Sequence, residues 1–173
     1  MASTAGTVHN YVPTSTSSNS TSFASITLSH GPSYLFYYDA DNNLACLSGS
    51  EPGVFSNMTI QTSPGVTIQA GTISPLTATG FESPEGTLEG IRLYYVERDT
   101  NLIKELCSVE GKTWYCGDLD KKEYKIASSG GLACSSGATI RLQVFFADAN
   151  NDGKIVEAYV NRDTMLWESN VIR

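Results

Sequence analysis

Carboxylate and amide side chains stand at every second position of the segment Asp148-Ala-Asn-Asn-Asp-Gly153. Oxygen ligands at this spacing, followed by a glycine turn, can wrap a hard cation, so Asp148, Asn150 and Asp152 are candidate ligands for Ca2+. The bidentate glutamate that ends such a loop is absent, because residue 159 is tyrosine. The same residue types are also what a β-turn requires, and both interpretations stay open. We expect no other cofactor.

Arg92 and Glu105 form the second group with the potential for chemistry. A guanidinium presents N–H donors in a fixed fork and a carboxylate presents acceptors, so the pair suits a ligand with neighbouring hydroxyl groups. An aromatic ring beside the pair would pack against the apolar C–H face of such a ligand. The alternative is that Arg92 and Glu105 form only a cross-strand ion pair on a solvated sheet face.

Catalytic signatures are missing from the sequence. It has no G-x-S-x-G, no H-E-x-x-H and no phosphate-binding loop, and its two histidines, His9 and His30, have no assigned partner. Glu105 and Glu157 stand on different repeats, so we expect them to be farther apart than the roughly 5 to 9.5 Å that glycoside hydrolysis uses. We therefore expect a binding protein and not an enzyme.

Charge and hydropathy exclude two classes of partner. The formal net charge is −7, and the basic residues form no cluster longer than Lys121-Lys122, which does not suit nucleic acid or an anionic membrane. No apolar run approaches the roughly 20 residues that span a bilayer, so we expect no membrane insertion. The start, Met1-Ala-Ser-Thr-Ala-Gly, lacks the features of a signal peptide. We expect a cytoplasmic location or non-classical secretion.

The four cysteines, at positions 46, 107, 116 and 134, lack the spacing of metal ligands. Cys107 and Cys116 flank an expected hairpin, and they would face each other if its loop were the two residues Gly111-Lys112 but not if it had four residues. Without classical export, free and buried thiols are the expectation.

The elements that must position these side chains come from a repeat. Three segments share a strand that ends in an aromatic pair, an acidic and Asn-rich turn, and a second strand: 34–44, 92–102 and 143–153. Their aromatic pairs begin at positions 37, 94 and 145, which lie 57 and 51 residues apart. A period of this size is typical of radially repeated folds, in which each unit buries its apolar face against its neighbours.

Each repeat divides into four short strands, as a propeller blade does, and no sustained helical periodicity occurs. We predict an all-β fold with three blades at about 22–62, 74–119 and 130–169 of a domain that spans 22–173. The expected strands are 22–28, 34–39, 44–47 and 54–60 in the first blade, 76–81, 91–96, 102–107 and 113–116 in the second, and 131–134, 139–146, 154–160 and 164–167 in the third.

Three blades cannot close a ring, because propellers use about 4 to 8. Open ends would expose unpaired strand edges and apolar faces, which a second chain related by a two-fold axis would cover. We predict a homodimer with a six-bladed ring. Residues 1–21 form a Ser/Thr-rich arm, which either completes the seam along the last strand of the partner or is solvated.

The segments Ile91-Arg-Leu-Tyr-Tyr, Ile103-Lys-Glu-Leu-Cys107 and Gly111-Lys-Thr-Trp-Tyr-Cys-Gly117 resemble the repeat of the fucose-specific six-bladed propeller lectins of fungi and some bacteria. The likeness is strongest over 91–117, weaker over 139–169 and only architectural over 22–60. It implies a fungal-type lectin that binds fucose, or a fucose-like sugar, on fucosylated glycans.

In that family the sugar lies between two blades, with Arg and Glu from one blade and aromatic residues from the next. The resemblance therefore assigns Arg92 and Glu105 to this site, with Tyr159 and Trp167 as the aromatic residues. In the first blade, Tyr34 or Leu35 stands where Arg would be and Cys46 stands where Glu would be.

The sequence of the third blade indicates a second, weaker sugar site. It keeps Glu157, but Gln143 aligns with the family arginine and Arg141 lies two residues earlier on the same strand face. The aromatic residue would be Phe55 from the first blade of the partner chain. The alternative function is a structural or protein-interaction module that kept the propeller and lost sugar binding.

Overall fold

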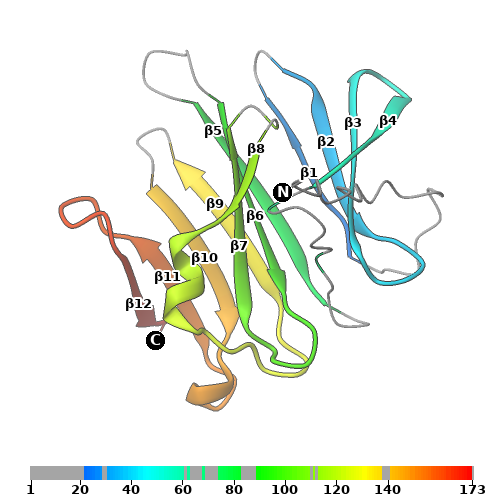
Figure 1. The fold of residues 1–173 in the computed structure, drawn as a ribbon. Helices are drawn as coiled ribbons and strands as arrows, with labels where there is room; N and C mark the ends of the chain where they lie inside the picture. The colour runs from blue at the N-terminus through cyan, green and yellow to red at the C-terminus, as the bar shows by residue number, and fades with distance from the viewer. Residues whose placement is uncertain are drawn as a thin grey trace, which may run out of the picture.

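The computed structural model describes residues 22–28, 31–60, 62, 68, 74–82, 89–109, 111, 113–137 and 141–172. These residues form three four-stranded antiparallel sheets, and each sheet keeps its strands in chain order (Figure 1). The prediction of an all-β fold with three four-stranded blades is confirmed. The arm, at 1–21, lies outside the described residues.

Each sheet is one blade. Blade 1 consists of β1 (Ala24–Thr27), β2 (Ser33–Tyr38), β3 (Leu44–Glu51) and β4 (Val54–Met58). Blade 2 consists of β5 (Leu76–Glu82), β6 (Glu89–Val96), β7 (Ile103–Val109) and β8 (Thr113–Cys116). Blade 3 consists of β9 (Leu132–Gly137), β10 (Arg141–Ala147), β11 (Ile155–Val160) and β12 (Trp167–Val171). Two short 3-10 helices, η1 (Asp118–Lys122) and η2 (Ala149–Asn151), complete the described elements.

The last strand differs from its expected position, 164–167, because it begins only at Trp167. Asn161 explains the difference. Its Oδ1 accepts the N–H groups of Asp163 (2.9 Å) and Thr164 (3.3 Å), which folds these residues into a turn. The local hydrogen bonds of an Asn side chain thus replace the sheet pairing that the sequence pattern favoured.

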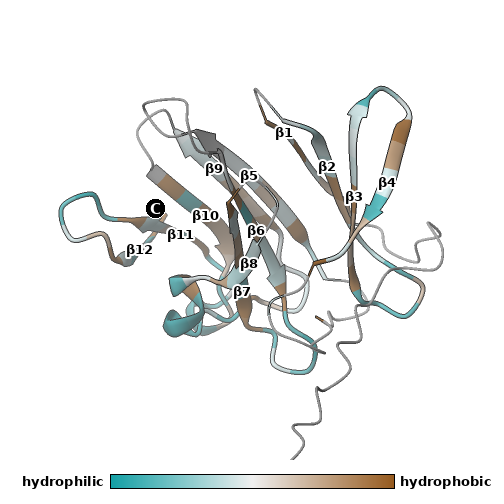
Figure 2. Cartoon of the chain, turned by 45° about the horizontal axis from the view of Figure 1, so that its top comes forward, coloured by the Kyte–Doolittle hydropathy of each residue, from teal (hydrophilic) through white to brown (hydrophobic). Residues whose placement is uncertain are grey.

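Strand alternation divides the core into two layers. On β6, Ile91, Leu93 and Tyr95 pack in the cluster shared with blade 1, whereas Tyr94 and Val96 pack in the cluster shared with blade 3. Successive side chains of a strand point to opposite faces, so blade 2 is apolar on both sides. Figure 2 shows apolar residues along the strands of blades 2 and 3 and hydrophilic residues in several of the turns.

Blade 1 is offset by one residue from its predicted alignment. The repeat pairs Tyr37 with Tyr94, but Phe36 and Tyr38 are the residues that pack toward blade 2. The ladder agrees, because Phe36 pairs with Cys46 as Tyr94 pairs with Glu105. In the structure, position 36 of blade 1 therefore corresponds to position 94 of blade 2. Tyr34 is the counterpart of Arg92 and Cys46 that of Glu105, as expected for the first blade.

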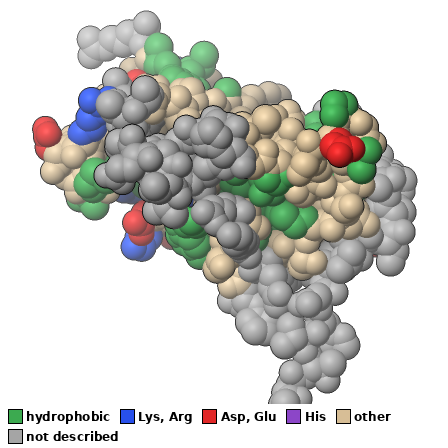
Figure 3. Space-filling view, turned by 90° about the horizontal axis from the view of Figure 1, so that it is seen from above, with side chains coloured by type: hydrophobic (Ala, Val, Ile, Leu, Met, Phe, Trp, Pro, Cys, Tyr) green, Lys and Arg blue, Asp and Glu red, His purple; other side chains and the backbone are tan. Residues whose placement is uncertain are grey.

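The outward faces of blades 1 and 3 carry exposed apolar side chains. Phe55 on blade 1 is 42% exposed, Phe23 just before β1 is 55% exposed, and Ile155 on blade 3 is 55% exposed. On the face of the molecule shown in Figure 3, the Lys and Arg side chains of the described residues are few and form no continuous patch. None of the described helices is long and apolar enough to span a membrane.

All four thiols are free. Cys107 pairs with Tyr115 across the β7–β8 hairpin and Cys116 pairs with Leu106, so the two cysteines do not face each other. Cys107 and Cys46 are buried, as expected, whereas Cys116 is exposed.

Candidate functional site

Arg92 and Glu105 meet on the face of blade 2 that packs toward blade 3. Arg92 Nε lies 3.5 Å from Glu105 Oε1, and the side chains are 17% and 3% exposed. Tyr94, two residues from Arg92 on the same strand face, is fully buried in the cluster between blades 2 and 3. The ion pair is therefore not on a solvated sheet face. It lies in the seam between two blades, and Arg92 is its more accessible member.

Glu105 is held as a buried hydrogen-bond acceptor. The Tyr94 hydroxyl donates to Oε1 (3.2 Å) and the Leu119 backbone N–H donates to Oε2 (3.2 Å). Burial raises the pKa of Glu105 above its ordinary value, while the Leu119 N–H, Arg92 and the Tyr94 hydroxyl act in the opposite direction. These three donors offset part of the cost of desolvating the carboxylate, and burial remains the larger effect.

Trp167 lies in the same seam. Its ring meets that of Tyr94 edge to face, with centroids 6.2 Å apart and planes at 88°. Trp167 is 4% exposed and belongs to the cluster between blades 2 and 3. The structure therefore brings together three of the four residues predicted for the first site, with Tyr94 between the ion pair and the indole.

Tyr159 does not reach this seam, which corrects its predicted placement. Val156 and Ala158 face blade 2, so the alternation of β11 turns Tyr159 to the opposite face of blade 3. There its hydroxyl donates to Glu168 Oε2 (3.1 Å) and accepts from Asn170 Nδ2 (3.4 Å). Val160, and not Tyr159, occupies the position in blade 3 that Ser108 occupies in blade 2. Ser108 is the ladder partner of Trp114, and Val160 is the ladder partner of Trp167.

The residues of the predicted second site are divided between the two ends of the chain. Gln143 Nε2 donates to Glu157 Oε1, and Ser135 Oγ donates to Gln143 Oε1 (3.2 Å), on the outward face of blade 3. Arg141 is the first residue of β10 on that blade. Phe55 is on β4 of blade 1, and blade 2 separates it from this group. Within the described part of one chain, Phe55 and Glu157 therefore do not meet.

Aromatic side chains fill the equivalent seam between blades 1 and 2. Tyr34 and Phe36 are stacked with centroids 6.3 Å apart, and Phe36 meets Trp114 edge to face at 5.8 Å. Cys46, the counterpart of Glu105, is fully buried. This seam presents packed rings where the next seam presents an ion pair.

The acidic loop at the end of β10 forms a turn. Asp148 Oδ1 accepts the N–H of Asn150 (2.9 Å), and Asp148 Oδ2 accepts from Asn151 Nδ2 (2.5 Å). Asp152 has a left-handed backbone, with φ 54°. Within the described part of the chain, no group of three or more His, Cys, Asp or Glu side chains is placed to hold a metal ion. The geometry of Asp148, Asn150 and Asp152 fits the turn interpretation.

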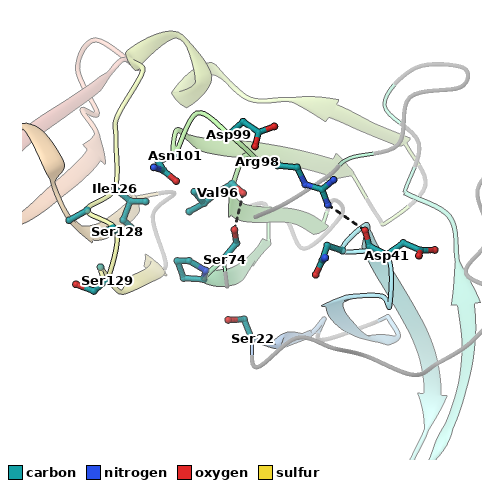
Figure 4. A pocket seen from close by; sticks show the side chains of 14 residues that line it. Ser22, Asp41, Ser74, Val96, Arg98, Asp99, Asn101, Ile126, Ser128 and Ser129 are labelled. Carbon is teal, nitrogen blue, oxygen red and sulfur yellow. Dashed lines mark hydrogen bonds between the residues drawn. The ribbon is translucent and has the colours of Figure 1, made fainter. Parts of the chain in front are cut away.

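A polar hollow of about 770 Å³, which the sequence did not indicate, lies among the turns between second and third strands and the segment before blade 3 (Figure 4). Arg98 crosses it, and its Nη2 donates to the Asp41 carbonyl (3.4 Å). Ser74 Oγ donates to the Val96 carbonyl (3.3 Å). The Arg98 contact joins the turn of blade 1 to that of blade 2, whereas the Ser74 contact lies within blade 2.

Other residues at the Arg92–Glu105 seam were not assigned to it from the sequence. Tyr94 is fully buried, and its hydroxyl donates to Glu105. Leu119 contributes a backbone N–H, which leaves no side-chain signal. Gly117 was part of the recognised motif and could have marked a close approach.

Comparisons with known proteins identify the family. A sequence model of the family described as fungal fucose-specific lectin matches residues 61–171. No curated protein matches the chain.

Three solved structures show the fold. AofleA from Arthrobotrys oligospora is 23% identical, with a TM-score of 0.66, over 87% of this chain and 41% of its own. The six-bladed β-propeller lectin of Aleuria aurantia is 21% identical, with a TM-score of 0.63, over 87% of this chain and 47% of its own. A fucose lectin from Kordia zhangzhouensis, in complex with methyl-fucoside, is 21% identical, with a TM-score of 0.60, over 87% and 98%. The chain thus spans less than half the length of the two fungal lectins, and its three sheets are propeller blades.

Proposed function

This chain belongs to the fungal fucose-specific lectin family, and we propose that it binds fucose, or a fucose-like sugar, in the seam between blades 2 and 3. The observation that carries the proposal is the Arg92–Glu105 ion pair, which lies between the blades and beside Trp167. The matched residues, 61–171, include both blades and the whole seam. The relative from Kordia zhangzhouensis is complexed with methyl-fucoside, which supports the same ligand class.

The chemistry of the seam suits a sugar with adjacent hydroxyl groups. Arg92, at the rim, supplies N–H donors, and the Glu105 carboxylate behind it supplies an acceptor whose hydrogen bonds strengthen in a buried setting. Trp167 and Tyr94 form an aromatic floor beneath the pair. A pyranose presents hydroxyls on one edge and C–H groups on another, which matches polar and aromatic surfaces placed side by side.

Binding without catalysis is part of the proposal. Glu105 faces blade 3 from blade 2, whereas Glu157 lies on the far face of blade 3 with Gln143. A sheet therefore separates these carboxylates, and they cannot flank one glycosidic bond. No metal ion takes part in the proposed mode of binding.

We also propose that two chains pair into a six-bladed ring. Both end faces expose large apolar side chains, including Phe55 on blade 1 and Ile155 on blade 3, which a second copy would bury. Phe55 is the counterpart of Trp114 and Trp167. Because Cys46 corresponds to Glu105, Gly49 corresponds to Ser108, and Phe55 lies against Gly49 as Trp114 lies against Ser108. Pairing would place Phe55 of one chain against Gln143 and Glu157 of the other, which forms the weaker second site.

A glycan array tests the function. The lectin proposal expects signal on fucosylated glycans and none on their matched glycans without fucose. The competing interpretation, a propeller used only for protein interaction, expects no glycan-dependent signal. An array without any fucose-dependent binding, from a protein with a native thermal transition, would favour that second interpretation.

A further inference from the structure

The segment that leads from blade 2 to blade 3 encloses Glu105 on several sides. The Gly117 N–H donates to the Glu105 carbonyl (2.9 Å), and the Leu119 N–H donates to its carboxylate. Asp120 Oδ1 accepts the Glu105 backbone N–H (2.7 Å). Three residues of the segment 117–120 therefore fix both the backbone and the side chain of one glutamate.

Gly117 has no conformational reason to be glycine. Its φ of −85° and ψ of 169° are extended values that any residue adopts. The reason is space, because a Cβ atom on Gly117 would overlap the carboxylate group of Glu105. Gly111 differs, since its φ of +67° favours glycine regardless of its neighbours. Gly117 and Glu105 are thus a matched pair in which one residue leaves room for the other.

Leu119 connects this segment to the rest of the seam. Its side chain is fully buried in the cluster that contains Tyr94 and Trp167. The residue that donates to Glu105 is therefore anchored against the aromatic floor of the site. A shift of the segment would move the carboxylate relative to Trp167.

We propose that Gly117 and Asp120 are positioning residues of the sugar site: they hold the Glu105 carboxylate at the place where it faces Arg92 and a bound hydroxyl group. This inference rests on the proposed function for its role in binding. Neither residue needs to touch the sugar. Gly117 acts by leaving space, and Asp120 acts by anchoring the Glu105 backbone.

The first test is a double-mutant cycle between Gly117→Ala and Glu105→Ala, followed by Tm and by calorimetric titration with methyl-α-L-fucoside. In the wild-type background, Gly117→Ala should lower Tm by about 2 to 10 °C, the range for overpacking in a chain of this size, and weaken binding at least 10-fold. In the Glu105→Ala background, the same change should leave Tm unchanged or raise it, because alanine restricts the unfolded chain. Gly131→Ala is the matched control, since no atom lies within 4 Å of a Cβ placed there.

The second test separates the hydrogen bond that Asp120 accepts from its negative charge. Asp120→Asn keeps an oxygen that can accept the Glu105 N–H, so fucoside affinity should be retained, whereas Asp120→Ala should weaken it at least 3-fold. The charged and titratable groups around Glu105 are Arg92, Tyr94, Cys107 and Asp120, and the charge of Asp120 raises the pKa of Glu105. Asp120→Asn should therefore move the acid limit of binding to lower pH, a shift that a purely structural role would not cause.

Two results would overturn the inference: an equal loss of Tm from Gly117→Ala in both backgrounds, or unchanged affinity in Asp120→Ala. A wild-type protein that binds no fucoside would instead overturn the proposed function and the role of both residues in binding. The Tm cycle needs no ligand, so it would still decide whether Gly117 makes room for Glu105.

Discussion

Arg92→Ala is the substitution whose effect follows most directly from the seam. It removes the guanidinium that lies 3.5 Å from Glu105 and is the more exposed member of the pair. A hydrogen bond to a charged group contributes about 1.5 to 3 kcal/mol. The loss of one such contact with the sugar corresponds to a roughly 10- to 150-fold weaker Kd. The same change also leaves the buried Glu105 without its cation, so the pKa of Glu105 rises further.

Isothermal titration calorimetry with methyl-α-L-fucoside measures the Kd, and Tm measured in parallel separates lost binding from lost folding. Arg92→Gln is the closest matched variant, because Gln143 pairs with Glu157 in the same way on blade 3. Arg98→Ala is the distant control, since Arg98 binds the Asp41 carbonyl in the polar hollow. Equal Kd values for wild type and Arg92→Ala, with both proteins folded, would refute the assignment of the site.

Four further outcomes are expected. Trp167→Ala removes a buried indole, so the free energy of unfolding should fall by about 3 to 5 kcal/mol and fucoside binding should weaken. Trp167→Phe should keep most of the stability and most of the affinity. An unchanged Tm in Trp167→Ala would contradict the packing. Because burial raises the pKa of Glu105, the contribution of Glu105 to folding stability is present at low pH and lost as pH rises through the folded pKa. Fucoside affinity should change in the opposite direction and fall on acidification, because the carboxylate becomes protonated. A Kd that does not change with pH down to the ordinary glutamate range would oppose this. Sedimentation should give twice the chain mass at micromolar concentration, Phe55→Asp should reduce it to one chain mass, and a monomeric wild type would exclude the ring. Asp148→Ala should lower Tm through loss of the turn, and Ca2+ should not change the Tm of the wild type; a calcium-dependent rise would restore the cation interpretation.

The fold was predictable because its signals are local and repeated. Blades 2 and 3 follow the predicted aromatic pairs, and the pairs Tyr94 with Glu105 and Phe145 with Glu157 occupy the same ladder position. Blade 1 shows the limit. Both Phe36 and Tyr37 are aromatic, so the sequence could not decide which faces blade 2, and a shift of one residue exchanges the two faces of a strand.

The site was predictable only where the sequence showed which residues of a strand face which side of the sheet. Arg92, Glu105 and Trp167 lie on faces that the core pattern of blades 2 and 3 determines. Tyr159 was assigned one position away from Val160, and that single step moved it to the other side of the sheet.

The contacts made by segment 117–120 could not be read from the sequence. They use backbone N–H groups and the absence of a side chain at Gly117. Such contacts depend on where the chain passes, and residue types alone do not encode that path.

The central claim is that the seam between blades 2 and 3 holds the sugar. A crystal structure of the protein with methyl-α-L-fucoside tests it most directly. We predict density for the sugar between Arg92 and Glu105 of blade 2 and the aromatic residues beside Trp167, with hydroxyl groups within hydrogen-bond distance of the guanidinium. Sugar density at another seam or in the polar hollow around Arg98, with this seam empty, would contradict the claim.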